Sequence, residues 1–222
     1  LAPQTIFFGG GTPSILNLRQ WETILEAMRR LGLSGAREWT VECNPATVSA
    51  DKAKLLHEGG VTRISMGVQS LNEALLDRLG RVHSRAMVFK SYDILRNAGF
   101  ERVNLDLMFA IPSQTMPVWQ ETLRETIAMQ PEHLSCYEVI YEQDTPLYEQ
   151  LQAGEFDVQE ELACDMFEEL VRVAGEQGFY QYEVANFGRH QGVGVFDIPD
   201  EACLHNVNYW RGGDYHGLGP SA

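Results

Sequence analysis

The sequence predicts an α/β fold built on a parallel sheet or barrel. Two observations support this: strand-like and helix-like stretches alternate through residues 1–145, and a Gly-rich turn follows the first strand. Strands that alternate with helices require right-handed crossovers, and these produce a parallel sheet. The alternation stops at Pro146, so we expect a first part at 1–145 and a mixed extension of helix, strand and loop at 146–222.

The elements of the first part follow from residue type and spacing. The expected strands are rich in β-branched and aromatic residues and cover 5–8, 38–43, 63–68, 102–109 and 133–139. Apolar residues at helical spacing predict a helix over 18–31, and further helices are expected at 49–57, 73–78, 85–98 and 117–129. Ser49 is typical of a helix N-cap, and Gly59 and Gly60 are typical of a helix end.

The extension begins after an acidic loop that follows the fifth strand. We expect a helix over 159–177, a strand-like stretch over 180–187 and then a tail rich in loops. Six glycines mark that tail: Gly192, Gly194, Gly212, Gly213, Gly217 and Gly219. The acidic excess of the chain lies mainly in 143–183, which is typical of solvated helix faces.

Composition excludes several classes of protein. Apolar residues make up 44% of the 222 residues and charged residues 22%, as in an ordinary globular protein. The net charge of −14, with 17 dispersed basic residues, argues against a nucleic-acid partner. No run of about 18 apolar residues or signal peptide is present, so we expect no transmembrane segment and a cytoplasmic location.

The four cysteines are too widely spaced to form a metal pair or a disulfide framework, and we expect reduced thiols. The chain starts without Met on the threshold of a strand and ends without a closing element. We therefore expect it to be an internal fragment of a longer protein.

The Gly-rich turn is the first candidate binding site. It has the sequence FFGGGTPS at residues 7–14, directly after the first strand. Glycine lacks a Cβ, so the peptide groups of this turn can touch a ligand at the carboxyl end of the sheet, where α/β folds bind ligands. The turn matches neither the phosphate-binding loop nor the dinucleotide fingerprint. Taken alone, it also fits a tight connection between strand and helix.

Polar side chains at or near the ends of the next four strands point to the same crevice. They are Glu42, Gln69, Asp106 and Glu138. Asp106 lies between two leucines, and burying such a carboxylate is costly unless it is paired or hydrogen bonded. One explanation is a structural bond to a loop N–H or to Arg81. The other is a small polar ligand that bears amine and hydroxyl groups.

Eight segments, in their order and spacing, resemble one known family. They are FFGGGTPS, VECNP, RISMGVQS, LGRVHS, NLDLMFAIPSQT, YQYEVANF, HNVNYW and YHGLGPSA. The family is that of the radical SAM haem chaperones HemW, also labelled oxygen-independent coproporphyrinogen III oxidase-like. The resemblance spans essentially the whole chain. It implies an incomplete (β/α)6 barrel, here at 1–145 without its first strand, that binds S-adenosylmethionine (SAM) beside a 4Fe–4S cluster.

The resemblance assigns SAM contacts to individual residues. By the GGGTP motif, Gly10, Gly11 and Thr12 would meet the methionyl amino group through backbone atoms. By the ExNP motif, Glu42 would accept hydrogen bonds from SAM.

Three further positions resemble those assigned in the family to SAM or to a second SAM site: Gln69, Arg81 and Asp106. The ammonium, carboxylate and ribose hydroxyls of SAM are chemically complementary to such side chains. The alternative for Arg81 is a surface or helix-terminal ion pair.

The family's cluster-binding motif, Cys-x3-Cys-x2-Cys, lies upstream of the GGGTP strand and is not in this chain. We therefore expect no metal ligands here, and we expect the edge of strand 5–8 to be exposed. Ala110 and Ser113 replace two glycines of the family's GLPGQT segment.

Two functions are compatible with the resemblance. The first is a haem chaperone that binds haem and passes it to an acceptor protein. The alternative is an oxygen-independent coproporphyrinogen III oxidase, which uses a radical derived from SAM for oxidative decarboxylation. LGRVHS and HNVNYW favour the chaperone, because the oxidases differ at both places.

Haem ligation has several candidates in the sequence. His205 has the most ligand-like setting, beside Asn206, Tyr209 and Trp210. The other candidate ligands are His83, His133, His216 and the thiolate of Cys203. The aromatic residues of the tail, including Tyr215, could face a porphyrin or pack on the barrel.

Overall fold

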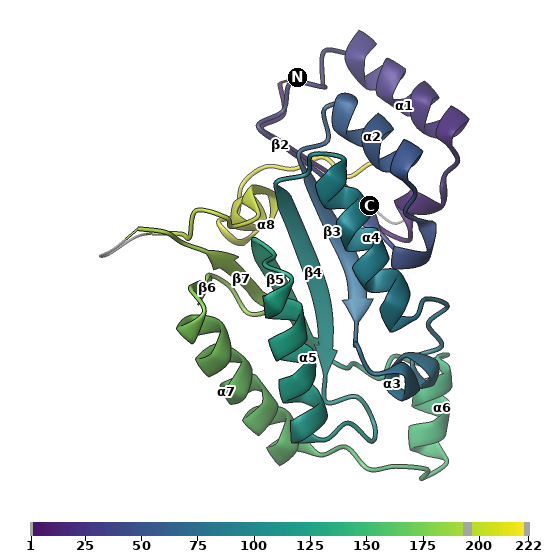
Figure 1. Cartoon of the computed structure of the whole chain (residues 1–222), viewed down its shortest axis with the longest axis vertical. Coiled ribbons are helices and arrows are strands. Elements are labelled where there is room, and N and C mark those ends of the chain that lie inside the picture. Colours follow the sequence, from purple (N-terminus) through teal and green to yellow (C-terminus); the bar gives the residue numbers. More distant parts are fainter. Residues whose placement is uncertain (1, 193–196, 220–222) are drawn as a thin grey trace.

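The structure is a computed structural model that describes residues 2–192 and 197–219. Within these residues a sheet of seven strands runs in the order β1-β2-β3-β4-β5-β7-β6 (Figure 1). The first five strands are parallel: β1 Thr5–Phe8, β2 Glu38–Cys43, β3 Arg63–Gln69, β4 Arg102–Phe109 and β5 His133–Glu138. The last two are antiparallel to their neighbours: β6 Phe179–Gln181 and β7 Asn186–Arg189.

Helices connect the parallel strands. They are α1 Leu18–Arg30, α2 Ala50–Glu58, α3 Glu73–Arg78, α4 Arg85–Asn97 and α5 Met116–Ala128. The remaining helices are α6 Pro146–Gln152, α7 Glu160–Glu176 and α8 Leu204–Trp210. Two short 3-10 turns, η1 Pro13–Ile15 and η2 Pro45–Thr47, follow β1 and β2. The Ser49 hydroxyl accepts a hydrogen bond from the Lys52 N–H, which confirms Ser49 as the N-cap of α2.

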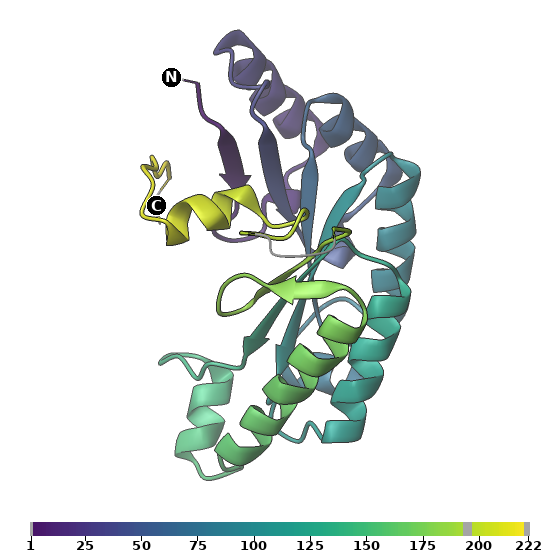
Figure 2. The same ribbon diagram turned by 90° about the vertical axis from the view of Figure 1, so that its left-hand side faces the viewer.

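The sheet is curved, with most helices on its outer face. Figure 2 shows α1, α2, α4, α5 and α7 in an arc around the sheet, while α8 crosses the inner, concave side near β1. This open α/β sheet confirms the predicted partial barrel. Residues of the extension continue the same sheet, because β7 pairs with β5. β1 stands at the other end of the described sheet and is covered in part by α8.

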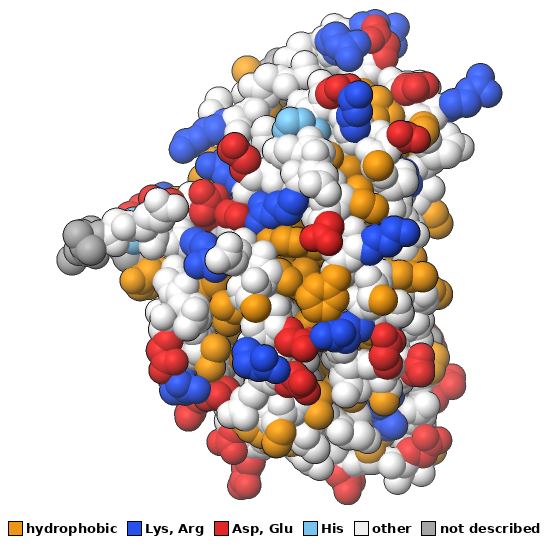
Figure 3. Space-filling model, viewed as in Figure 1, with side chains coloured by type: hydrophobic (Ala, Val, Ile, Leu, Met, Phe, Trp, Pro, Cys, Tyr) orange, Lys and Arg blue, Asp and Glu red, His pale blue; other side chains and the backbone are white. Residues whose placement is uncertain are grey.

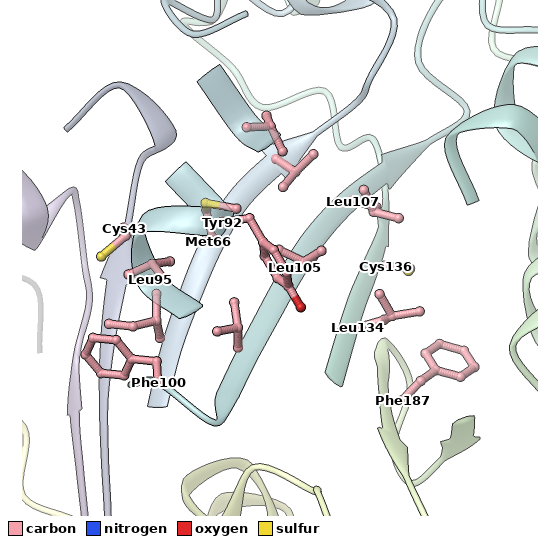
Figure 4. Packing of buried hydrophobic residues seen from close by; sticks show 14 of the residues in the cluster. Cys43, Met66, Tyr92, Leu95, Phe100, Leu105, Leu107, Leu134, Cys136 and Phe187 are labelled. Atoms are coloured by element: carbon pink, nitrogen blue, oxygen red, sulfur yellow. The ribbon is translucent and has the colours of Figure 1, made fainter. Parts of the chain in front are cut away.

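Apolar and polar side chains alternate along each parallel strand, so the two faces of the sheet differ in polarity. Their outward side chains form the hydrophobic core under the helices, as Figure 4 shows for Cys43, Met66, Leu105, Leu134 and Cys136. The alternate positions on the concave side are mostly polar. Parallel strands are usually apolar on both faces. The polar inner face therefore indicates a site rather than a second core.

The predicted elements agree with the structure to within two residues wherever periodicity was strong. The stretch 180–187 was predicted as one strand, but it forms the two antiparallel strands β6 and β7 with a turn between them. Two short helices, α6 and α8, were missed. The first lies in a polar, acidic segment, and the second is rich in residues with weak helix propensity. Gly194 of the predicted tail lies outside the described residues.

The surface of the helical face is mixed in charge. Figure 3 shows acidic side chains gathered toward the end of the molecule where α6 lies, with basic side chains scattered elsewhere on this face. No helix within 2–192 and 197–219 is both long enough and apolar enough to span a membrane.

Candidate functional site

The interior of the barrel, on the concave side of the sheet, contains a cavity of about 540 Å³. Side chains from all five parallel strands line it, together with residues from the loops after α3 and β5. Asn186, Cys203 and Asn206 of the extension close it from the concave side. Because parallel strands end at the same edge of a sheet, residues distant in sequence meet here.

Four of the residues predicted to contact SAM line this one cavity: Glu42, Gln69, Arg81 and Asp106. Glu138, the remaining polar residue predicted for this crevice, lines it as well. Glu42 comes from β2, Gln69 from the end of β3 and Asp106 from β4. Arg81 lies in the loop after α3 and makes no ion pair with the residues that the structure describes. This observation argues against the alternative interpretation of Arg81 as a structural ion-pair partner.

The Gly-rich turn is connected to the cavity by a hydrogen bond to Glu42, which lines it. The backbone N–H of Gly10 donates a hydrogen bond to the Glu42 carboxylate. Burial raises the pKa of Glu42, and this bond from Gly10 opposes the rise. Gly10 and Gly11 have φ values of 75° and 139°, which disfavour any other residue. Thr12, Gly10 and Gly11 do not themselves line the cavity.

Asp106 is held by neighbours on its own and the adjacent strand. Asn104 Nδ2 donates to Asp106 Oδ1 at 2.6 Å, and Ser65 Oγ lies 3.2 Å from the same oxygen. Burial raises the pKa of Asp106 to about 7, and the negative charge of Glu42 adds to the rise while the Asn104 and Ser65 bonds oppose it. From the sequence we expected a loop N–H or Arg81 as the hydrogen-bond partner of the Asp106 carboxylate. In the structure its partners are Asn104 and Ser65.

Gln69 sits at an irregularity in the sheet. The register between β3 and β4 shifts between Gly67 and Gln69, and Gln69 has a φ of 66°. A non-glycine residue in this region is strained, and such strain is concentrated at functional sites. A Cβ on Gly67 would lie 3.1 Å from Gln69 Nε2. The bulge therefore gives the Gln69 side chain its place in the cavity wall.

The candidate haem ligands occupy different settings. His205 stacks on Phe7 with ring centroids 5.1 Å apart, and its Nδ1 lies 3.1 Å from Thr5 Oγ1. Its backbone N–H donates to Glu38 Oε1 at 3.1 Å, and burial lowers the pKa of its imidazole. Cys203 Sγ lies 3.4 Å from the same Glu38 oxygen.

The remaining candidate histidines divide into two buried side chains and one exposed side chain. His83 is buried and bonds to the Val68 carbonyl at 3.0 Å, and His133 belongs to a buried network described below. His216 is exposed. Tyr209, Trp210 and Tyr215 are 56–62% exposed, so a large part of each ring is open to a ligand.

Sequence reasoning missed most of the inner polar layer. This layer contains Ser65, Asn104, His133, Ser135 and Asn186, all buried and hydrogen bonded to one another. The available signal was the alternation of polar and apolar residues along the strands. Asn104, for example, lies two residues before Asp106 and therefore faces the same side of the sheet.

A second missed feature is a buried ion pair whose arginine, Arg63, helps to line the cavity. Arg63 Nε lies 3.2 Å from Glu38 Oε2, and both side chains are at most 2% exposed. Arg63 Nη2 also donates to the carbonyls of Glu201 and Ala202 at 2.8 and 3.2 Å. The pair thus fixes the segment that leads into α8.

Among residues 2–192 and 197–219 no group of three or more His, Cys, Asp or Glu side chains is arranged to bind a metal ion.

Comparison with known proteins defines the class. The model of the Radical SAM superfamily matches residues 2–126, more than half of the chain. The chain therefore belongs to the radical SAM superfamily.

Within that superfamily the chain is similar to several curated proteins, including two that are named heme chaperones. It is 36% identical to heme chaperone HemW of Bacillus subtilis and 37% identical to heme chaperone HemW of Escherichia coli, over 99% of this chain in both cases. It is also 37% identical to radical S-adenosyl methionine domain-containing protein 1, mitochondrial, of Danio rerio, over 98% of this chain. These findings confirm the resemblance found in the sequence. The chain spans 56%, 55% and 48% of these relatives, respectively, or about half of their length.

A solved structure shares the fold. Coproporphyrinogen III oxidase (HemN) from Escherichia coli superposes with a TM-score of 0.74 and 24% identity, covering 85% of this chain and 44% of that chain. At this level of identity the likeness establishes the fold alone.

Proposed function

We propose that the protein to which this chain belongs is a haem chaperone that binds haem, transfers it to an acceptor protein and holds SAM in the barrel. The observation that carries the SAM part is the convergence of Glu42, Gln69, Arg81 and Asp106 on one cavity beside the Gly-rich turn. The haem part rests on the names of the relatives. A cytoplasmic location is part of the same proposal.

The chemistry of the cavity fits SAM. Its carboxylates, Glu42 and Asp106, suit the ammonium, the sulfonium charge and the ribose hydroxyls, and Arg81 suits the methionyl carboxylate. The backbone of Gly10 and Gly11 is open, because a Cβ on either residue would meet nothing within 4 Å. Thr12 and these glycines can therefore approach the methionyl end of SAM, while Gln69 offers amide groups from the opposite wall.

A 4Fe–4S cluster would supply the electron that cleaves SAM in radical chemistry. By the family resemblance its cysteine ligands would belong to the motif that precedes the GGGTP strand, and we assign no step to the cluster. This chain's own residues bind and orient SAM. Burial raises the pKa of both Glu42 and Asp106, so a cationic ligand would stabilise their ionised forms.

His205 is the proposed haem ligand. Its Nδ1 is engaged with Thr5, whereas its Nε2 has no hydrogen-bond partner in the described part of the chain. A bond at Nδ1 orients the imidazole and leaves Nε2 as the donor to iron. The exposed rings of Tyr209 and Trp210 on the same helix can cover a flat macrocycle.

The test uses the complete protein, reconstituted anaerobically with iron and sulfide. Haem is titrated in while SAM cleavage and coproporphyrinogen decarboxylation are followed. Stoichiometric haem binding without decarboxylation is expected. Decarboxylation coupled to SAM cleavage would instead make the protein an oxidase. His205→Ala should lose haem coordination in the Soret spectrum, while His216→Ala, a histidine of the same tail, should retain it.

A further inference from the structure

A continuous chain of hydrogen bonds joins Asp106 to the segment that begins α8. Asn104 Nδ2 donates to Asp106 Oδ1 at 2.6 Å, and Asn104 Oδ1 lies 2.6 Å from His133 Nδ1. His133 Nε2 lies 2.7 Å from the Tyr182 hydroxyl, which also accepts the Cys203 N–H at 3.1 Å. The chain runs from the cavity wall to the extension, across three elements that are far apart in sequence.

In this series of hydrogen bonds, the donor and acceptor of each bond follow from the other bonds that the same groups make. Asn104 Nδ2 also donates to Ser65 Oγ at 2.8 Å, so the amide nitrogen faces Ser65 and Asp106 and the amide oxygen faces His133. An oxygen at that place requires a proton on His133 Nδ1. His133 is 1% exposed, and burial lowers its pKa well below the usual value, so the ring is neutral and carries one proton. Nε2 must then accept, and Tyr182 must donate.

We propose that Tyr182 and His133 are positioning residues that hold the Asn104 amide with its nitrogen toward Asp106, and thereby couple the α8 segment to the charge state of the cavity. If His133 carried its proton on Nε2 instead, the Nδ1 lone pair would face the Asn104 oxygen. The amide would be driven to reverse, and its oxygen would then face the Asp106 carboxylate. In the proposed tautomer the Tyr182 hydroxyl donates to Nε2 and opposes this reversal, together with Ser135 Oγ, which donates to Asn104 Oδ1 at 3.1 Å.

The orientation of the Asn104 amide affects the cavity through the pKa of Asp106. Reversal of the Asn104 amide would remove a hydrogen bond that lowers the Asp106 pKa, so this pKa would rise above about 7. The groups whose charge or hydrogen bonds act on Asp106 come from several strands: Glu42, Ser65, Asn104, Ser135, Cys136 and Tyr137. Arg81 and Glu138 line the same cavity. The Asn104 amide is the member of this set that hydrogen bonds to both the His133 ring and Asp106.

The chain of hydrogen bonds from Asp106 to Cys203 also involves two segments of the sequence that the SAM site does not use. Tyr182 belongs to YQYEVANF, and Cys203 directly precedes the helix that contains HNVNYW. Cys203 donates its N–H to the Tyr182 hydroxyl, so displacement of the α8 segment removes a donor that orients this hydroxyl. A ligand that moves α8 would therefore change the proton affinity of Asp106.

The first test needs no substitution. In the complete protein labelled with ¹⁵N-histidine and left without iron, the His133 ring should show a protonated Nδ1 and an unprotonated Nε2. This is the less common tautomer of free histidine. A protonated Nε2 at His133 would overturn the proposal, whatever the protein binds.

The second test measures the Asp106 pKa by NMR of ¹³C-carboxyl-labelled aspartate, with the resonance assigned by its loss in Asp106→Asn. His133→Leu removes the Nδ1 donor and should raise the Asp106 pKa above the wild-type value. His133→Asn places an amide nitrogen where Nδ1 was and should restore it. Trp119→Phe is the matched control. It removes a buried ring N–H bond to the Met166 carbonyl, 2.9 Å long and outside the cavity, and should leave the Asp106 pKa unchanged.

An Asp106 pKa in folded His133→Leu equal to that of the wild type would overturn the proposal. If His133→Leu does not fold, the tautomer measurement on the wild type decides. Both readouts are independent of SAM and haem, so failure of this relay and failure of the proposed function are distinguishable.

Discussion

Gly9 and Glu42 are packed so closely that a Cβ on Gly9 would lie 2.8 Å from the carboxyl carbon of Glu42. The same Cβ would lie 2.7 Å from the ring of Phe7. Real Cβ contacts are longer than this, so a side chain at position 9 must displace one of the two groups. The first glycine of the Gly-rich turn is therefore required by the carboxylate that it touches.

Gly9→Ala should displace Glu42 and weaken SAM binding by about tenfold, the loss of roughly one charge-assisted hydrogen bond. Isothermal titration of SAM into the reconstituted complete protein measures this. Gly35→Ala is the matched control, because a Cβ at Gly35 meets nothing within 4 Å and its φ is not positive. Equal weakening in both variants would show that the effect of position 9 is not local.

SAM affinity should increase with pH through about 7. Burial raises the pKa of Asp106 to about 7, so its carboxyl group is largely protonated below that pH and ionised above it. The ionised form attracts the cationic ligand, and affinity should level off once ionisation is complete. Titrations between pH 6 and pH 8 check this, and Asp106→Asn should flatten the profile in that range. A pH profile of Asp106→Asn identical to that of the wild type would remove Asp106 from the site.

The same carboxyl group should make the fold less stable as pH rises. The pKa of Asp106 is about 7 in the folded protein against an ordinary value of 3.8, so the folded state binds the proton more tightly. Because of this group, the free energy of unfolding should fall by on the order of 2–4 kcal/mol between about pH 4 and pH 7. Above pH 7 this contribution should no longer change with pH. Asp106→Asn should be more stable than the wild type at pH 8 and closer to it at pH 4. Urea unfolding at the two values measures the difference, and a variant that is less stable at pH 8 would contradict the account.

The buried pair of Glu38 and Arg63 should be sensitive to loss of one charge. Glu38→Gln leaves the Arg63 guanidinium buried without its counter-ion, which should cost about 3–5 kcal/mol in the free energy of unfolding. Glu58→Gln removes the exposed partner of Lys54 and should change it by less than about 1 kcal/mol. Similar unfolding midpoints for the two variants would mean that the buried pair contributes no more than a surface pair.

The fold could be predicted because the outer faces of its strands and the inner faces of its helices carry regular patterns. Trp21 and Leu25, for example, are buried positions of the first helix, and their spacing marks it in the sequence. The short helix α8 could not be found in this way. Its histidine, asparagines and valine have weak helix propensity, and tertiary contacts such as the bond from His205 to Glu38 hold it in place.

The site was predictable where a polar residue ends a strand, as with Glu42 and Gln69. It was not predictable where partners depend on strand register. Asn104 faces Ser65 on β3 and His133 on β5, and no local pattern gives that alignment. Tyr182 reaches His133 through a turn of the extension, so its role depends on the return of the chain to the sheet.

The measurement that tests the central claim most directly is SAM binding to the complete protein, reconstituted anaerobically, with Glu42→Ala and Asp106→Ala compared with the wild type. The account predicts that the wild type binds SAM, and that each variant remains folded by circular dichroism but binds SAM at least about tenfold more weakly. Wild-type affinity in both variants would contradict the assignment of this cavity as the SAM site.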